Sequence, residues 1–117
     1  DFYREIIFDE LLGPVFEEVA EVDWAVHIPN LIDYWCRILL GLPGSAQRVT
    51  AVHRHLHGQH PLSAQHCDRW FELWTATIDA RWSGPIAQRA RHHAAVIMAG
   101  MARHIFDFEW APPEVAA

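Results

Sequence analysis

The sequence predicts an all-α domain. Apolar residues recur at helical spacing in every long segment, and pairs of glycine and proline separate the segments. The chain has no apolar–polar alternation typical of strands and no Asn-Gly or Asp-Gly hairpin turn. With 117 residues, 51% of them hydrophobic, it is long enough for one core. We expect one domain over residues 1–110 and a frayed tail over 111–117.

The first half of the chain predicts two helices. Residues 1–12 carry apolar side chains near the 3.6-residue period of an α-helix, and Gly13-Pro14 is expected to end that helix. Asp23 is a suitable N-cap for the next helix, which ends at Gly41-Leu42-Pro43-Gly44. Pro29 lies past its first turn, so a local distortion is expected there. The inward face of this helix is expected to carry Trp24, His27 or Ile28, Leu31, Tyr34 or Trp35, and Ile38.

The second half predicts three more helices. A short helix spans about 49–57 and ends at Gly58. An isolated helix of this length is not stable, so contacts with another group must stabilise it. Ser63 caps the next, which runs to the break at Ser83-Gly84-Pro85. The last helix extends over about 86–108.

Charge and composition exclude several classes of protein. The formal net charge is -6, and the nine cationic residues are scattered arginines that form no basic stripe for nucleic acid. No apolar run approaches the roughly twenty residues that cross a bilayer, and no secretory leader precedes Asp1, so we expect a cytoplasmic protein without membrane partners. Cys36 and Cys67 lack the spacing of a metal or disulfide framework and are interpreted as buried, reduced thiols.

Histidines are concentrated in one segment. Five of them fall within residues 53–66, and imidazole is the commonest protein ligand of transition metals. Imidazoles on a polar segment are also often solvated surface groups. One possible function is therefore a non-haem helical module in which His53, His57 and His60 bind Zn²⁺ or Ni²⁺. Another is a helical interaction domain whose tryptophans form a partner surface without any metal.

Several short motifs occur in a particular order. In the first half these are Asp1-Phe2-Tyr3, Leu11-Leu12-Gly13-Pro14-Val15-Phe16, Asp23-Trp24, His27-Ile28-Pro29, Asp33-Tyr34-Trp35 and Leu39-Leu40-Gly41. In the second half they are Ala51-Val52-His53 with Leu56, Pro61-Leu62-Ser63 and Asp68-Arg69-Trp70. Their order and spacing resemble the truncated haemoglobins of group III over nearly the whole chain, to about Phe106. The chain departs from that family in three ways. The first helix of the family is absent. Gln47-Arg48-Val49-Thr50 stands in place of the usual Gly-x-Pro-Met, and Cys67 stands where Phe is common.

The resemblance implies a truncated globin, a two-on-two helical sandwich around haem b. The haem would be held non-covalently, since the chain has no CxxCH attachment motif. The family register makes His53 the proximal ligand of the iron, with His57, one turn further on the same helical face, as its rival. On the other side of the iron the resemblance places three hydrogen-bond donors, Tyr3, His27 and Trp70. Phe16, Leu31 and Trp35 would form the apolar wall against the macrocycle.

The implied function is reversible binding of O₂ and other diatomic ligands, NO and CO. Tight retention by distal donors argues against oxygen delivery and suits chemistry on the ligand, such as NO detoxification or peroxide chemistry, which also calls for an electron donor. A sensing role is equally compatible with the pocket, so the resemblance leaves enzyme status open.

Overall fold

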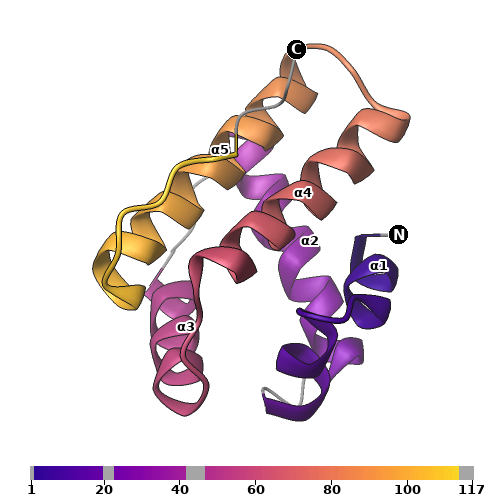
Figure 1. The fold of residues 1–117 in the computed structure, drawn as a ribbon. Helices are drawn as coiled ribbons and strands as arrows, with labels where there is room; N and C mark the ends of the chain where they lie inside the picture. The colour runs from indigo at the N-terminus through magenta and orange to yellow at the C-terminus, as the bar shows by residue number, and fades with distance from the viewer. Residues whose placement is uncertain (1, 20–22, 42–46, 114–117) are drawn as a thin grey trace.

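The computed structural model describes residues 2–19, 23–41 and 47–113, and these ranges contain helices and no strand. The elements are α1 (Phe2–Phe8), η1 (Val15–Val19), α2 (Trp24–Leu40), α3 (Gln47–Gln59), α4 (Ala64–Arg81), α5 (Pro85–Met101) and η2 (Ala102–Phe106). The two η elements are π-helical turns. The all-α prediction is therefore confirmed (Figure 1). None of the described helices combines the length and apolar character that a membrane span requires.

The helices α4 and α5 form an antiparallel pair, lying side by side in Figure 1. The chain turns between them at Gly84, whose φ of 95° favours glycine, and Pro85 opens α5 where its missing N–H has no helical partner to lose. The predicted break at Ser83-Gly84-Pro85 is thus confirmed. One core forms along this pair from the buried side chains of Cys67, Met98, Met101, Ala102, Phe106 and Trp110.

The C-terminal end of the described chain is attached to this core. The indole N–H of Trp110 donates to Asp68 of α4 at 2.8 Å, and the Trp110 side chain is buried. The last predicted helix, 86–108, is divided between α5 and η2, and it ends at Asp107 with a φ of 69°. The predicted tail, 111–117, begins after Trp110, and residues 114–117 lie outside the described residues.

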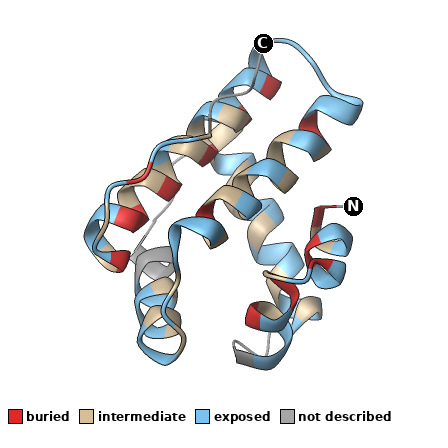
Figure 2. Cartoon of the chain, viewed as in Figure 1, coloured by how far each residue is buried: buried red, intermediate tan, exposed pale blue. Residues whose placement is uncertain are grey.

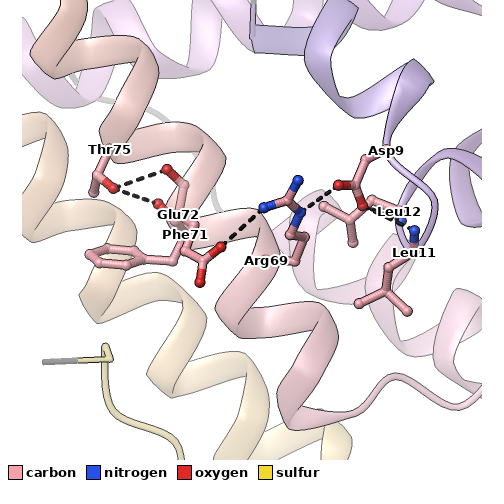
Figure 3. Close-up of polar contacts among 7 residues, drawn as sticks. All are labelled: Asp9, Leu11, Leu12, Arg69, Phe71, Glu72 and Thr75. Carbon is pink, nitrogen blue, oxygen red and sulfur yellow. Dashed lines mark hydrogen bonds and ion pairs between the residues drawn. The ribbon is translucent and has the colours of Figure 1, made fainter. Parts of the chain in front are cut away.

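The short helix α1 packs on α4 through the buried side chains of Phe2 and Ile6. It ends at Phe8 and not at Leu12, so the predicted span of 1–12 is too long; Asp1 lies outside the described residues. The reason is Asp9, whose buried carboxylate accepts the backbone N–H groups of Leu11 and Leu12 and so offers the chain an alternative to the helix (Figure 3).

A close backbone approach follows α1. A Cβ atom added at Gly13 would lie 2.6 Å from the carbonyl oxygen of Ile7, so only glycine fits where the chain folds back against the helix. This contact fixes the turn between α1 and η1 and hence the position of Phe16 in η1.

Local signals define α2 at both ends, as predicted. Asp23 accepts the backbone N–H of Ala25 at 3.1 Å, and Gly41 ends the helix with a φ of 70°. The helix is continuous through Pro29, so the expected distortion does not interrupt it. None of its residues is fully buried, although its sequence is strongly apolar (Figure 2).

The histidine-rich segment forms α3, which packs against η2. It is longer than the predicted 49–57 and runs through Gly58 to Gln59. Helices α2 and α3 therefore pack on different partners, since α2 lies against α5. One thiol prediction is wrong: Cys67 is buried as expected, but Cys36 is exposed on α2, and both are free cysteines.

Candidate functional site

Four aromatic rings meet around the N-terminal part of α2. His27 lies with its ring centroid 5.7 Å from Tyr3, 6.3 Å from Phe16 and 5.6 Å from Trp24. Phe16 and Trp24 are stacked at 5.9 Å with 15° between their planes. We call Tyr3, Phe16, Trp24 and His27 the ring cluster. It joins three separate elements, α1, η1 and α2, around one imidazole.

The ring cluster holds polar groups in an apolar environment. Burial raises the pKa of Tyr3 well above its usual range, so its phenol stays protonated and can donate a hydrogen bond. The indole of Trp24 instead donates to Glu17 at 2.9 Å, at the exposed side of the cluster. Trp24 was predicted only as a residue of the inward helix face, and its ring contacts with η1 are not apparent from helical periodicity.

Trp70 reaches the same region from α4. Its ring lies 6.0 Å from Phe2, which in turn lies 4.9 Å from Tyr3. Whereas the indole N–H of Trp74 donates to the carbonyl of Ala90 at 3.2 Å, the structure records no acceptor for the indole of Trp70 among the described residues. Nor does it record one for the Tyr3 hydroxyl within those ranges. Both predicted donors therefore have hydrogen-bonding capacity to offer a ligand.

His27 of α2 and His53 of α3 are electrostatically coupled. Burial lowers the pKa of His27, and the charge that His53 carries when protonated lowers it further. A protonated His53 therefore disfavours protonation of His27, which lies 26 positions earlier in the sequence. Both side chains are half-buried, and His27 is neutral at pH 7 because its pKa is depressed.

His57, the rival ligand, has a partner within the protein. Its Nδ1 accepts the backbone N–H of Leu62 at 3.0 Å, and its ring lies 5.0 Å from Phe106 of η2. A neutral imidazole that accepts through Nδ1 carries its proton on Nε2. The nitrogen that could reach outward to a metal is therefore protonated in this arrangement.

Two further histidines lie at the junction of α3 and α4. The Nδ1 of His66 accepts the backbone N–H of Ser63 at 3.1 Å, which completes the predicted cap of α4. His60 lies 5.7 Å from the His66 ring, and its buried Nδ1 has no hydrogen-bond partner within the described part of the chain. Among the described residues, no three His, Cys, Asp or Glu side chains converge to hold a metal ion. The alternative with Zn²⁺ or Ni²⁺ on His53, His57 and His60 is therefore not supported.

The other two predicted wall residues lie further along α2. Leu31 is half-buried one turn after His27. Trp35 stacks on Trp74 with ring centroids 4.4 Å apart, and it also contacts His93 at 5.3 Å. Trp74 and His93 were not predicted as site residues, because local periodicity does not indicate which side chains of α2, α4 and α5 contact one another.

Two surface hollows lie elsewhere along α1 and α4. One, of about 390 Å³, is lined by residues including Arg4, Leu73 and Arg81, and the other, of about 470 Å³, by residues including Phe8 and Arg69. Neither is lined by His27 or His53. The candidate site is thus defined by the ring cluster and by His53, whose charge acts on His27, and not by these hollows.

Comparison with known proteins adds no assignment: the chain matches no protein-family model, no curated protein and no solved structure.

Proposed function

We propose that this chain is a haem b protein of the truncated globin type, with a two-on-two helical arrangement, that binds O₂, NO and CO. The observation that carries the proposal is the ring cluster, in which the half-buried His27 lies against Tyr3, Phe16 and Trp24, with the charge of His53 on α3 acting on the same imidazole. A proximal ligand on one side and a polar distal group on the other is what a haem iron needs.

The donor set fits haem better than a bare metal ion. A structural zinc site takes four protein ligands, whereas haem iron needs one imidazole from the protein in an apolar pocket. Haem would also bury apolar surface of α2, which has no fully buried residue despite its apolar sequence. On this proposal Phe16, Leu31 and Trp35 lie toward the macrocycle.

His53 is the proposed proximal ligand. The hydrogen bond from the Leu62 N–H to Nδ1 of His57 supports this choice, because it leaves the Nε2 of His57 protonated. His57 then serves to connect α3 to the segment that enters α4, and the iron is assigned to His53, one turn earlier on the same helix. The coupling of His53 to His27 supports the same choice.

The distal donors determine what happens to the ligand. Haem supplies the binding centre for the diatomic molecule, and the protein supplies Tyr3 and Trp70 as donors. Donors in a water-poor pocket favour a ligand that carries partial negative charge, such as O₂, over the less polar CO. Strong retention suits chemistry on the ligand, either NO oxidation or peroxide chemistry, supported by an external electron donor.

Haem reconstitution tests the proposal. The purified protein is titrated with haem, and the product is quantified by its pyridine haemochrome spectrum alongside elemental analysis. We expect one haem per chain and its complete extraction into acidified organic solvent, because the group is non-covalent. The variant His55→Gly, at an exposed position of α3, is the matched control and should bind haem equally. A stoichiometry far below one, or zinc in the purified protein, would contradict the proposal.

A further inference from the structure

A row of aromatic side chains leads away from the candidate site. Trp70 and Trp74 are stacked with centroids 5.8 Å apart and planes 4° from parallel. Trp74 stacks on Trp35 at 4.4 Å, and Trp35 contacts Tyr34 at 5.6 Å. We call Trp70, Trp74, Trp35 and Tyr34 the aromatic row. It is continuous from α4 to α2, since each ring contacts the next.

The row ends in a hydrogen bond between helices. The hydroxyl of Tyr34 lies 2.9 Å from the Nε2 of His93 on α5. Both residues are half-buried, and the adjoining Asp33 and His92 are exposed, so this end lies at the surface. Burial lowers the pKa of His93, and the charge of His92 lowers it further, which keeps the imidazole neutral and able to accept a proton.

We propose that the aromatic row is an electron relay through which Tyr34 is reversibly oxidised to a neutral tyrosyl radical, which oxidises small one-electron donors, such as phenols, at the surface. The proposal rests on the proposed haem function for its oxidant. It concerns a second site, some distance along α2 from the ring cluster, with its own substrate class.

The electrons and protons balance in each pass. A bound haem would supply the oxidising centre, at which a hydroperoxide would be reduced to an alcohol and water with two electrons from the protein and two protons from solvent. One electron passes from Tyr34 through Trp35, Trp74 and Trp70 toward the pocket, and the phenolic proton moves to Nε2 of His93. A phenol at the surface then gives an electron and a proton to restore Tyr34, and His93 releases its proton to solvent. Two such passes consume one hydroperoxide and two donor molecules.

The hydrogen bonds give the relay its direction. The indole N–H of Trp74 donates to the carbonyl of Ala90, and a backbone carbonyl is far too weak a base to remove a proton from an oxidised indole. Tyr34 has an imidazole for its proton, within the distance needed for proton transfer. The one-electron-oxidised state therefore does not remain on Trp74, and it is retained at Tyr34.

Rapid freezing of the haem-loaded protein after addition of hydrogen peroxide tests the relay by electron paramagnetic resonance. We expect a tyrosyl radical in the unmodified protein, its loss in Tyr34→Phe, and a marked loss in Trp74→Phe and in Trp35→Phe. Trp82→Phe is the matched control, because Trp82 is exposed at the end of α4 and lies outside the row. Circular dichroism checks that each variant retains its helices. A radical of undiminished yield in both Trp74→Phe and Trp35→Phe would overturn the relay.

A second experiment needs no haem. Cys36 is exposed next to Trp35, whereas Cys67 is buried and its pKa is raised to about 12 by burial and by the charge of Asp68, so thiol reagents select Cys36. A ruthenium complex attached there, excited by a flash and then oxidised by a soluble electron acceptor, should take an electron from Tyr34 and so generate the tyrosyl radical, seen by its transient absorption. We expect loss of that signal in Tyr34→Phe and slower formation in His93→Phe.

The two experiments separate the proposals. Failure to load haem contradicts the proposed function, and the flash experiment then still decides whether Tyr34 and His93 act as a pair. Haem loading without a peroxide-induced tyrosyl radical overturns the relay alone. Unchanged radical formation in His93→Phe after flash excitation overturns the assignment of His93 as the proton acceptor.

Discussion

Asp9 and Arg69 form an ion pair that joins the end of α1 to α4, with the carboxylate buried and the guanidinium half in solvent (Figure 3). The same carboxylate accepts the N–H groups of Leu11 at 3.1 Å and Leu12 at 2.9 Å. Arg69 also reaches Glu72 at 3.1 Å. One buried carboxylate thus ends α1, fixes the turn after it and holds that turn against the helix that carries Trp70.

Replacing Asp9 by Ala should destabilise the protein. The change leaves two backbone N–H groups without their acceptor, and hydrogen bonds to a charged group are worth about 1.5 to 3 kcal/mol. We expect a loss of that size in the free energy of unfolding by urea. Asp79→Ala is the control: Asp79 pairs with Arg91 at 2.6 Å but is 61% exposed, so its loss should cost at most about 1 kcal/mol. Equal effects of the two changes would show that burial of Asp9 is unimportant.

The same carboxylate should make stability depend on pH. Burial alone would raise the pKa of Asp9, but the N–H of Leu12, the guanidinium of Arg69 and the N–H of Leu11 outweigh it, and the pKa lies below its usual 3.8. Folding therefore favours the ionised form. The ionised Asp9 carboxylate contributes its full stabilisation of the folded protein well above pH 3.8, and this contribution is lost as the pH falls through the lower pKa of the folded state.

The comparison of Asp9→Asn with the unmodified protein isolates this effect. The melting temperature of the variant should be lower at neutral pH, and the gap should shrink as both proteins are taken into the acid range below the usual carboxyl pKa. A gap that stays constant across that range would exclude Asp9 as the titrating group.

Local signals predicted α2 and the start of α4, because Asp23, Gly41 and Ser63 act on backbone groups only a few residues away. The end of α1 was misjudged for a related reason. Asp9 accepts from Leu11 and Leu12, a competition that apolar periodicity ignores. Such a turn could have been anticipated from the Asp that precedes Gly13-Pro14.

Contacts between distant segments were not predictable in this way. Periodicity alone left Tyr34 and Trp35 as alternatives for the inward face, and it could not show that Tyr34 meets His93 across 59 positions. Cys36 is exposed because it follows Trp35 on the helix, whose ring turns toward Trp74. Of the predicted site, Tyr3, Phe16 and His27 meet directly, and the family resemblance, not periodicity, selected them.

Exchange of the proximal ligand distinguishes His53 from His57. Replacing the ligand by Gly removes the imidazole and opens a cavity that free imidazole can fill. We expect His53→Gly to lose the five-coordinate ferrous haem spectrum and to regain it when imidazole is added. His57→Gly should leave the spectrum almost unchanged, although it removes the contact with Leu62 and lowers stability. The opposite result would place the proximal ligand one helical turn further along α3.

Removal of the distal donors should affect O₂ far more than CO. Tyr3 and Trp70 approach the site from different helices, and no described residue accepts a hydrogen bond from either side chain. A hydrogen bond to a partly charged acceptor is worth about 1.5 to 3 kcal/mol, and about 1.4 kcal/mol corresponds to a factor of ten. Tyr3→Phe and Trp70→Phe should therefore each speed O₂ release roughly ten- to a hundredfold and barely change CO release. The double variant should be less than additive, because both donors share one acceptor.

Trp82→Phe, remote and exposed, should release both gases like the unmodified protein. Stopped-flow kinetics measure all four, and unchanged O₂ release in both single variants would reduce Tyr3 and Trp70 to packing residues.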